Sequence, residues 1–187
     1  MNMLNIDLIV IAGGASRRMG VDKALLPVPP HDLALIRHVI ERLSDLVTGK
    51  TIVVANDTAL SKKAALPESV EQVPDDYPGA GALGGLATGL ARCEGWAMAV
   101  ACDLPLVNPD VFSLLADHIE STAGQTWDAI VPKTEGYPQP LHALYHRRCL
   151  PAMQVALEAD QLRIISFYRA VRVHYVEEAE LQRIDPN

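Results

Sequence analysis

The sequence has few cysteines, no long apolar run and no excess of positive charge, and each shortage excludes a class of protein. Its three cysteines are Cys93, Cys102 and Cys149. An odd number of cysteines without metal-type spacing predicts reduced thiols and argues against a disulfide framework or a zinc site. The apolar run near the N-terminus is too short to span a membrane, and no basic segment precedes it as in a signal peptide. We therefore expect a cytoplasmic protein with no membrane partner.

The balance of charge also limits the possible ligands. The net charge is −7, which argues against non-specific nucleic-acid binding. An anionic ligand must therefore meet local positive charge, and residues 17–23 supply it. With 187 residues, 49% of them hydrophobic and 21% charged, the chain has the size and composition of one globular domain. No linker or repeat divides it, so we predict a single domain over residues 1–187.

Short apolar runs alternate with helical patterns along the chain. The runs that predict buried strands lie at residues 6–12, 51–55, 70–73, 96–101, 129–132, 141–145 and 172–176. The helical patterns lie at residues 33–47, 59–65, 83–92, 109–121, 150–159 and 162–171. Asp32 is predicted to cap the first helix, and Asn108 with Pro109 to begin the fourth. Because the strands are apolar on both faces, the pattern predicts a three-layer α/β fold, in which helices cover both sides of a mostly parallel, Rossmann-like sheet.

The stretch IDLIVIAGGASRRMGVDKALL, at residues 6–26, carries the strongest functional signal. Its apolar strand ends at Gly13 and Gly14, which lack a Cβ and so let backbone N–H groups approach a ligand closely. Arg17, Arg18 and Lys23 follow within a few residues. A strand, a glycine turn and three cations together predict a site for a polyanion, most simply the phosphate chain of a nucleotide. The alternative is an ordinary turn whose cations are only solvated.

Two familiar phosphate-binding motifs are excluded at this place. The stretch is not a Walker A loop, because no Gly-Lys-Ser/Thr ends it, and Gly14 and Gly20 are wrongly spaced for GxGxxG. Gly79, Gly81 and Gly84 do match that second motif formally, but no firm strand precedes them. We predict instead that they belong to a loop that leads into a helix N-terminus.

Polar residues follow several of the predicted strands. In open sheets of this kind, ligands bind at the carboxyl ends of the strands. The glycine loop, Asn56, Asp75 and Asp103 all lie just after such ends, so we expect one ligand to contact all of them. Asp103 is either a Mg²⁺ ligand or a turn residue. Asn56 and the pair Asp75–Asp76 either contact the ligand or form turns.

A pair of histidines has the spacing of a metal site. His142 and His146 are four residues apart, which suits two ligands on a helix. The prolines around them predict extended chain, so a packed or solvated pair is the better interpretation.

The opening motif closely resembles the signature of the molybdenum cofactor guanylyltransferases. That signature runs Leu-Ala-Gly-Gly-x-Ser-x-Arg-Met-Gly-x-Asp-Lys, and this chain differs from it only by Ile11 in place of Leu. The segment Cys102–Pro105 resembles the metal-binding motif of these enzymes, and Gln139–Leu141 resembles a segment on their acceptor side. All three occur in the order of the family, over most of the chain.

The resemblance implies an enzyme with the nucleotide-diphospho-sugar transferase fold. It would transfer GMP from GTP to the terminal phosphate of molybdopterin and release pyrophosphate, with Mg²⁺ bound by Asp103. Arg18, Lys23 and Asp103 would be catalytic. The residues that the resemblance implies in contact with GTP are Ile11, Ala12, Gly13, Gly14, Lys23, Asn56, Asp75 and Asp103. The resemblance also implies transient contact with proteins that make or accept the cofactor.

Other activities remain open. A cytidylyltransferase for the same cofactor and a sugar-phosphate nucleotidyltransferase share a looser form of the motif, although the second glycine resembles the guanylyl enzymes. A non-catalytic nucleotide-binding subunit is the alternative from another class. The family also has an Asn-x-Asn-Thr-Pro strand near its C-terminus. This chain ends at LQRIDPN without that motif, so we expect it to stop just before it.

Overall fold

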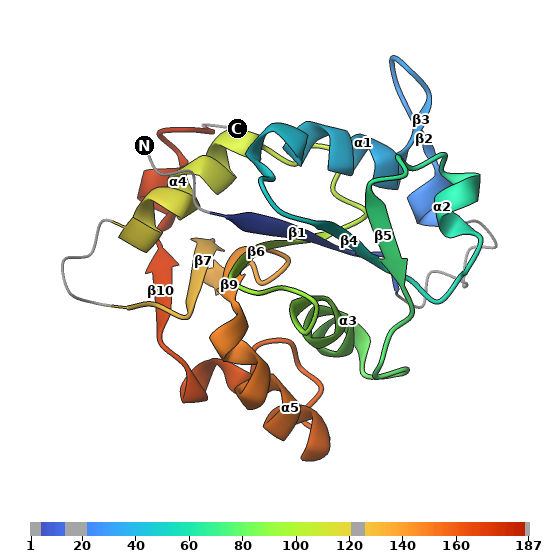
Figure 1. Cartoon of the computed structure of the whole chain (residues 1–187). Coiled ribbons are helices and arrows are strands. Elements are labelled where there is room, and N and C mark those ends of the chain that lie inside the picture. Colours follow the sequence, from blue (N-terminus) through green and yellow to red (C-terminus); the bar gives the residue numbers. More distant parts are fainter. Residues whose placement is uncertain (1–4, 14–21, 121–125, 186–187) are drawn as a thin grey trace.

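The computed structural model describes residues 5–13, 22–120 and 126–185. These residues form one central sheet with helices on both of its faces (Figure 1). The predictions made for Gly14, Arg17 and Arg18 lie outside the described residues.

The sheet within the described residues has eight strands, in the order β10-β7-β9-β6-β1-β4-β5, with β8 paired to β7. β9 runs antiparallel to both of its neighbours, and the other strands along this order are parallel. The predicted fold class, a mostly parallel sheet between two helical layers, is therefore confirmed. The strands are β1 (Ile6–Ile11), β4 (Thr51–Val54), β5 (Val70–Val73), β6 (Trp96–Ala101), β7 (Ala129–Thr134), β8 (Tyr137–Pro138), β9 (His142–His146) and β10 (Val173–Val176).

Helices α1 (Leu35–Leu43) and α4 (Pro109–Glu120) cover one face of the sheet, and α3 (Gly81–Leu90) and α5 (Leu150–Glu158) cover the other (Figure 1). Side chains of β1 alternate between the two layers, as they must on a pleated strand. Val10 joins the cluster under α1 and α4, and Ile9 joins the cluster over α3 and α5. Both are fully buried, so the apolar sequence of β1 follows from its central place.

Two glycines of α3, Gly85 and Gly89, allow close packing against β1. A Cβ on Gly89 would overlap Cγ2 of Ile9, and one on Gly85 would lie 3.0 Å from Cγ2 of Ile11. A Cβ on Gly84 would lie 2.9 Å from the carbonyl oxygen of Tyr77. The structure thus agrees that this stretch is a loop leading into a helix, and Gly84 is required by packing within it.

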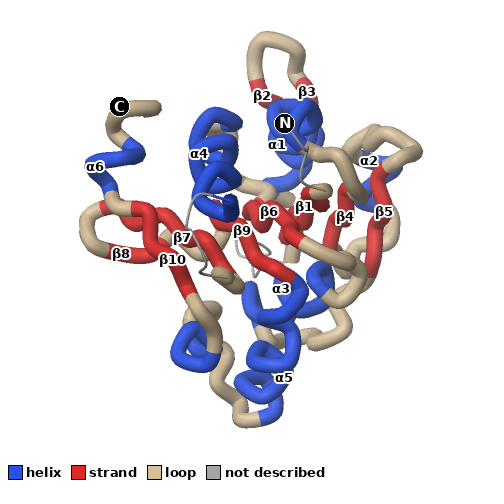
Figure 2. Tube along the Cα trace, turned by 60° about the vertical axis from the view of Figure 1, so that its left-hand side comes forward, coloured by secondary structure: helices blue, strands red, loops and turns tan. Residues whose placement is uncertain are grey.

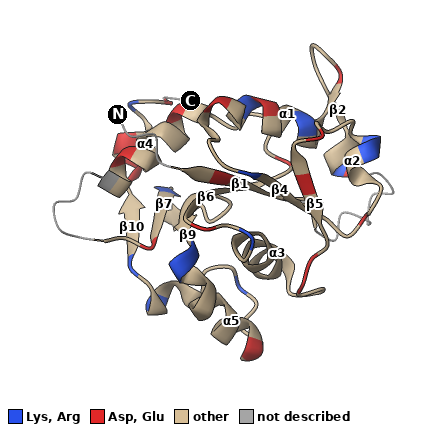
Figure 3. Ribbon diagram, viewed as in Figure 1, with Lys and Arg blue, Asp and Glu red and all other residues tan. Residues whose placement is uncertain are grey.

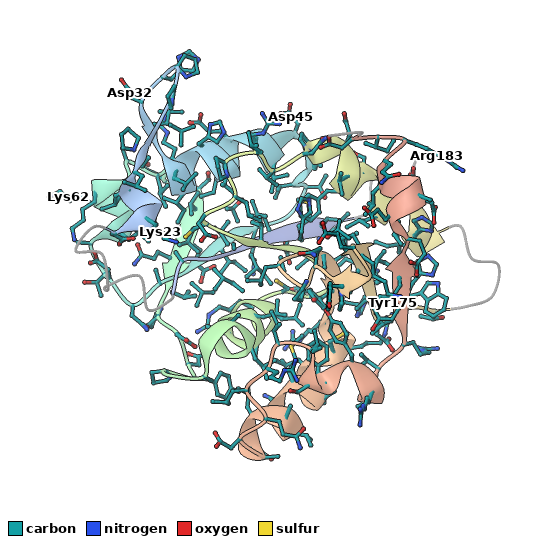
Figure 4. All side chains as sticks on the ribbon, turned by 180° about the vertical axis from the view of Figure 1, so that it is seen from behind. Lys23, Asp32, Asp45, Lys62, Tyr175 and Arg183 are labelled. Carbon is teal, nitrogen blue, oxygen red and sulfur yellow. The ribbon has the colours of Figure 1, made fainter. Side chains whose placement is uncertain are left out.

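The predicted start of the first helix is wrong. Asp32 does not cap it but lies with a φ of 51° in the turn of a small hairpin between β2 (Pro27–Val28) and β3 (Leu33–Ala34). The hairpin projects from the body in Figure 2, and Figure 4 shows Asp32 at its tip. Helix α1 begins after the second hairpin strand and ends at Leu43, followed by a 3₁₀ turn, Ser44–Leu46. Pairing of two short strands, which no local pattern shows, takes up the residues expected in the first helical turn.

The fourth helix starts as predicted. Asn108 Oδ1 accepts a hydrogen bond from the Asp110 N–H at 3.0 Å, and Pro109 is the first residue of α4. The short helix expected near residue 60 is α2 (Leu60–Lys63). In contrast, the helix expected over residues 162–171 is only a 3₁₀ turn, Ser166–Ala170. After β10 the chain forms a short helix, α6 (Glu178–Leu181).

Two further features concern the surface of the molecule. Within the described ranges, no helix is both long and apolar enough to span a membrane. In Figure 3, α1 carries both basic and acidic residues, α2 carries basic residues and α4 carries acidic residues.

Candidate nucleotide-binding site

The carboxyl ends of four parallel strands stop at the same level. Ile11 of β1 is paired with both Val54 of β4 and Ala101 of β6, and Val54 is paired with Val73 of β5. The ladder extends one residue beyond each of three strands: the N–H groups of Ala12, Ala55 and Cys102 donate to the carbonyls of Val54, Val73 and Ile11 at 3.0, 2.9 and 3.1 Å. The next residues, including Gly13, Asn56, Asp75 and Asp103, therefore leave the sheet along one edge, as the sequence predicts.

Lys23 and Asp103 face each other at this edge. The Lys23 Nζ lies 3.9 Å from Asp103 Oδ2, and the two side chains are 45% and 48% exposed. Lys23 begins a 3₁₀ turn, Lys23–Leu25, which Asp22 caps by accepting a hydrogen bond from the Ala24 N–H at 3.1 Å. An ion pair this exposed contributes little to stability, so both groups are available to a ligand. Figure 4 shows Lys23 at the same end of the molecule as Lys62 of α2.

The backbone beside this pair is open. Gly13 is exposed, and a Cβ built on it would meet no heavy atom within 4 Å. Packing therefore does not require a glycine here, in contrast to Gly84, Gly85 and Gly89 of α3. Ile11 is buried and Ala12 is half-buried, so any contact of theirs with a ligand would come mainly from the backbone. Gly14 and Arg18, which the sequence places next, lie outside the described residues.

Asp75 is held in a defined orientation by three residues. Its Oδ1 accepts hydrogen bonds from the Tyr77 N–H at 2.9 Å and the Thr88 hydroxyl at 3.1 Å. Its own N–H donates to Asn56 Oδ1 at 3.0 Å. Within the described part of the chain, Oδ2 of Asp75 accepts no hydrogen bond and is the oxygen left for a ligand. Asn56 uses its amide oxygen to hold Asp75, and its amide nitrogen donates no hydrogen bond to a described residue.

Asp76 is engaged elsewhere. Arg92 donates to it from Nη1 at 2.8 Å and from Nη2 at 3.2 Å. Hydrogen bonding to Arg92 lowers the pKa of the Asp76 carboxyl. Of the two neighbouring carboxylates, Asp75 is therefore better placed to meet a ligand.

Comparison with known proteins identifies the family. Residues 8–174 match the MobA-like NTP transferase domain. The chain belongs to this family. Among MobA-like relatives, a probable molybdenum cofactor guanylyltransferase of Pelotomaculum thermopropionicum is 32% identical over 97% of this chain and 83% of its own length. A molybdenum cofactor guanylyltransferase of Vibrio campbellii is 32% identical over 90% of this chain and 83% of its own length.

A solved structure shows the same MobA-like architecture. Molybdopterin-guanine dinucleotide biosynthesis protein A from Archaeoglobus fulgidus superposes with a TM-score of 0.77 at 26% identity, over 96% of this chain and 87% of that one. The chain is therefore a nucleotidyltransferase of the MobA-like family, with the fold that the sequence predicts.

The carboxylate at the MobA-like strand ends could bind a magnesium ion only together with oxygens of another molecule. Mg²⁺ keeps several waters and is usually bound by one or two carboxylates together with substrate phosphates. Asp103 is a half-exposed carboxylate beside the open space at Gly13. No group of three or more His, Cys, Asp or Glu residues could hold a metal ion in the described ranges. This donor set suits a shared metal better than one held by the protein alone.

Two other candidate groups in this MobA-like chain are structural. Burial raises the pKa of the Cys102 thiol to about 12, with the charges of Asp103 and Asp22 adding to the effect, so the thiol stays neutral. His142 stacks on Phe112 with ring centroids 4.6 Å apart, and His146 of the same strand packs edge-on against Trp96 at 5.3 Å. Each histidine therefore packs against an aromatic ring, which is one of the two interpretations that the sequence left open.

Sequence reasoning missed Thr88, which orients Asp75. It is fully buried in α3 and also accepts a hydrogen bond from the Asp76 N–H at 2.9 Å. The available signal was that Thr88 is the one hydroxyl in a helix of glycine, alanine and leucine.

Proposed function

We propose that the protein transfers GMP from GTP to the terminal phosphate of molybdopterin, which forms the guanine dinucleotide form of the cofactor and releases pyrophosphate. The observation that carries this proposal is the pairing of Lys23 with Asp103 at 3.9 Å, on the edge where the motif glycine Gly13 leaves open space. The acceptor, the molybdenum cofactor, and the base, guanine, are taken from the names of the two relatives.

The chemistry requires little proton transfer from the protein. A phosphate oxygen of the acceptor attacks the α-phosphorus of GTP, and the bond to the bridging oxygen of pyrophosphate breaks. Because the acceptor phosphate is already anionic, no general base is needed. Rate enhancement then depends on alignment and on neutralising charge.

Each site residue has a defined part in this scheme. Lys23 places a positive charge against the phosphate chain, and the backbone at Gly13 allows the nucleotide to lie close to the strand end. Asp75 offers its free Oδ2 to a donor group of the nucleoside, and Asn56 holds Asp75 in place. Arg18 and Gly14 are proposed to complete the phosphate contacts.

Asp103 would hold a magnesium ion together with phosphate oxygens of the nucleotide. When bound there, the ion would offset negative charge on the transferring phosphate. Because Lys23 lies 3.9 Å from Asp103, the cation and the metal ligand would act on the same part of the nucleotide. We also propose transient contact with the proteins that deliver molybdopterin and receive the product.

Two measurements test the function. Calorimetry with Mg²⁺ should show tighter binding of GTP than of CTP, UTP or ATP, and pyrophosphate release should require both GTP and molybdopterin. Equal or tighter binding of CTP would overturn the guanylyl assignment in favour of a cytidylyl enzyme. Selective GTP binding without pyrophosphate release would favour a non-catalytic nucleotide-binding subunit.

A further inference from the structure

We infer that Arg42 and His38 of helix α1 are positioning residues that fix the loop carrying Asp103, and so set the place of the magnesium ligand relative to Lys23. This inference rests on the proposed function, because it assigns these residues a task in the same site. It concerns residues outside every motif of the sequence analysis.

The loop between β6 and α4 is anchored in the core at Val107, with Leu104 packed against the same cluster, but its tip is not. The last ladder bond before it runs from the Cys102 N–H to the Ile11 carbonyl, and within the loop the Val107 N–H donates to the Leu104 carbonyl at 3.1 Å. Leu106 is 88% exposed, so the tip of the loop is not anchored by apolar packing. The side chain of Asp103 makes no hydrogen bond to a described residue and only the 3.9 Å ion pair with Lys23. Its position therefore depends on the backbone.

Two side chains of α1 reach that backbone. The Arg42 Nε donates to the Val107 carbonyl at 2.7 Å, which is a short hydrogen bond from a charged donor and so belongs to the stronger class. His38 Nε2 lies 3.0 Å from the Pro105 carbonyl. A carbonyl oxygen only accepts, so Nε2 carries the proton in this contact. The two bonds fix the loop on both sides of Leu106.

The same helix also supports the segment of Lys23. The Leu35 N–H at the start of α1 donates to the Leu26 carbonyl at 2.8 Å, directly after the 3₁₀ turn Lys23–Leu25. Helix α1 packs on that turn and lies over the sheet near β1 and β4 (Figure 1). One rigid element therefore contacts both halves of the site. Its N-terminal end holds the cation segment, and its residues 38 and 42 hold the carboxylate loop.

Outer contacts of this kind matter because a metal ligand works only when it is correctly oriented. Loss of such a contact typically lowers metal affinity or activity by about tenfold or more. A purely structural role would lower the stability of the protein but would not change the metal dependence of a folded variant selectively. The metal dependence is therefore the deciding property.

The test compares Arg42→Met with Arg37→Met. Both changes keep the apolar stem of an arginine on α1 and remove its donors. Among the described residues, the hydrogen bonds of Arg37 go to Glu41 and the Ala65 carbonyl and not to the loop of Asp103, so Arg37→Met is the matched control. His38→Leu removes the second contact, whereas His38→Gln keeps a donor near the place of Nε2. Thermal unfolding of each variant identifies those that fold.

We expect Arg42→Met and His38→Leu to raise the Mg²⁺ concentration for half-maximal turnover by about tenfold, with GTP binding in the absence of metal unchanged. His38→Gln and Arg37→Met should stay near the wild type. Without any ligand, the amides of residues 104–107 should exchange with solvent faster in Arg42→Met than in Arg37→Met. If Arg42→Met does not fold, the two His38 variants carry the same comparison.

The outcomes separate this inference from the proposed function. A wild-type protein that neither binds GTP with Mg²⁺ nor turns over overturns the function. A wild-type protein that does both, with folded Arg42→Met and His38→Leu matching Arg37→Met in metal dependence and amide exchange, overturns the positioning role alone.

Discussion

Lys23 and Asp103 face each other at the carboxyl-end edge of the sheet, with 3.9 Å between Nζ and Oδ2. They come from different strand-to-helix connections, and each is about half exposed. In the free protein the two charges partly neutralise each other. A nucleotide with its metal would replace this weak mutual contact by a phosphate contact for Lys23 and a metal contact for Asp103. The two residues should therefore respond differently to mutation.

Asp103→Asn should reduce turnover more than it reduces nucleotide binding. The change keeps the size of the side chain and removes the charge that would hold Mg²⁺. Charge on the transferring phosphate is greatest in the transition state, so we expect a loss of at least about a hundredfold, the scale of one strong electrostatic contact. Steady-state turnover over a Mg²⁺ titration measures the effect. Asp45→Asn, which changes an exposed carboxylate on the 3₁₀ turn after α1, is the control.

GTP binding to Asp103→Asn without metal should be unchanged or tighter, because a negative charge has been removed. Normal turnover of this variant at low Mg²⁺ would show that Asp103 is only a turn residue. Asp75 would then be the next carboxylate to examine as the metal ligand.

Lys23→Ala should weaken GTP binding as well as turnover. Hydrogen bonds to charged groups contribute roughly 1.5–3 kcal/mol, so we expect the Kd for GTP to rise by about tenfold or more. The difference from the wild type should shrink at high salt, because screening weakens contacts between exposed charges. Calorimetry at two ionic strengths measures both effects. Lys62→Ala, on the exposed side of α2 at the same end of the molecule (Figure 4), is the control, and equal behaviour of the two variants would contradict the phosphate role of Lys23.

Thr88→Val should disturb Asp75 without touching a ligand. Valine has nearly the shape of threonine but leaves Asp75 Oδ1 without one donor and the Asp76 N–H without its acceptor. An unsatisfied buried polar group costs roughly 1–3 kcal/mol, and we expect a loss of that size in the free energy of unfolding together with weaker GTP binding. Thr88→Ser keeps the hydroxyl and should restore the binding. If GTP binding is equal in the two variants, Asp75 does not need this orientation.

Much of the site was predictable because strand ends follow local rules. The apolar runs at 96–101 and 70–73 are β6 and β5 as predicted, and parallel pairing places the residues after these two strands on one edge of the sheet. The cap at Asn108 was also readable, because its donor lies two residues away. Such features depend on residues that are close together in the sequence, so a sequence pattern can predict them.

The features that sequence reasoning missed depend on distant partners. Asp32 is of a residue type that often caps helices, but pairing of β2 with β3 places it in a turn. The contacts of Arg42 with Val107 and of Thr88 with Asp75 join residues whose proximity depends on how α1 and α3 lie against the sheet. No spacing in the sequence encodes them. The family resemblance indicated the motif residues but not the residues that hold them in position.

The stability of the protein should depend on pH through His142. Burial lowers the pKa of His142 to about 4, below the ordinary value of about 6.5 in the unfolded chain. Between these values the unfolded state binds more protons than the folded state, so the free energy of unfolding should fall as pH is lowered from about 6.5 to about 4. His142→Phe keeps an aromatic ring for stacking on Phe112 and should flatten this dependence. Urea unfolding at several pH values, with His31→Gln on the exposed hairpin as control, measures it, and an unchanged slope in His142→Phe would exclude His142 as the source.

Gly89→Ala should lower mainly the stability of the protein, whereas Gly13→Ala should lower mainly its affinity for GTP. Gly89→Ala would gain helix propensity, worth up to about 1 kcal/mol, but its Cβ would overlap Ile9 at the centre of the sheet. Overpacking of a core costs roughly 1–3 kcal/mol, so we expect a net loss of stability. Gly13→Ala meets no atom within 4 Å and should leave the free energy of unfolding nearly unchanged. If a nucleotide fills the space beside Gly13, the added methyl group should instead weaken GTP binding, whereas GTP binding by folded Gly89→Ala should stay closer to the wild type. Urea unfolding and calorimetry on the two variants measure these quantities. Wild-type GTP affinity in Gly13→Ala would mean that the nucleotide does not approach the end of β1.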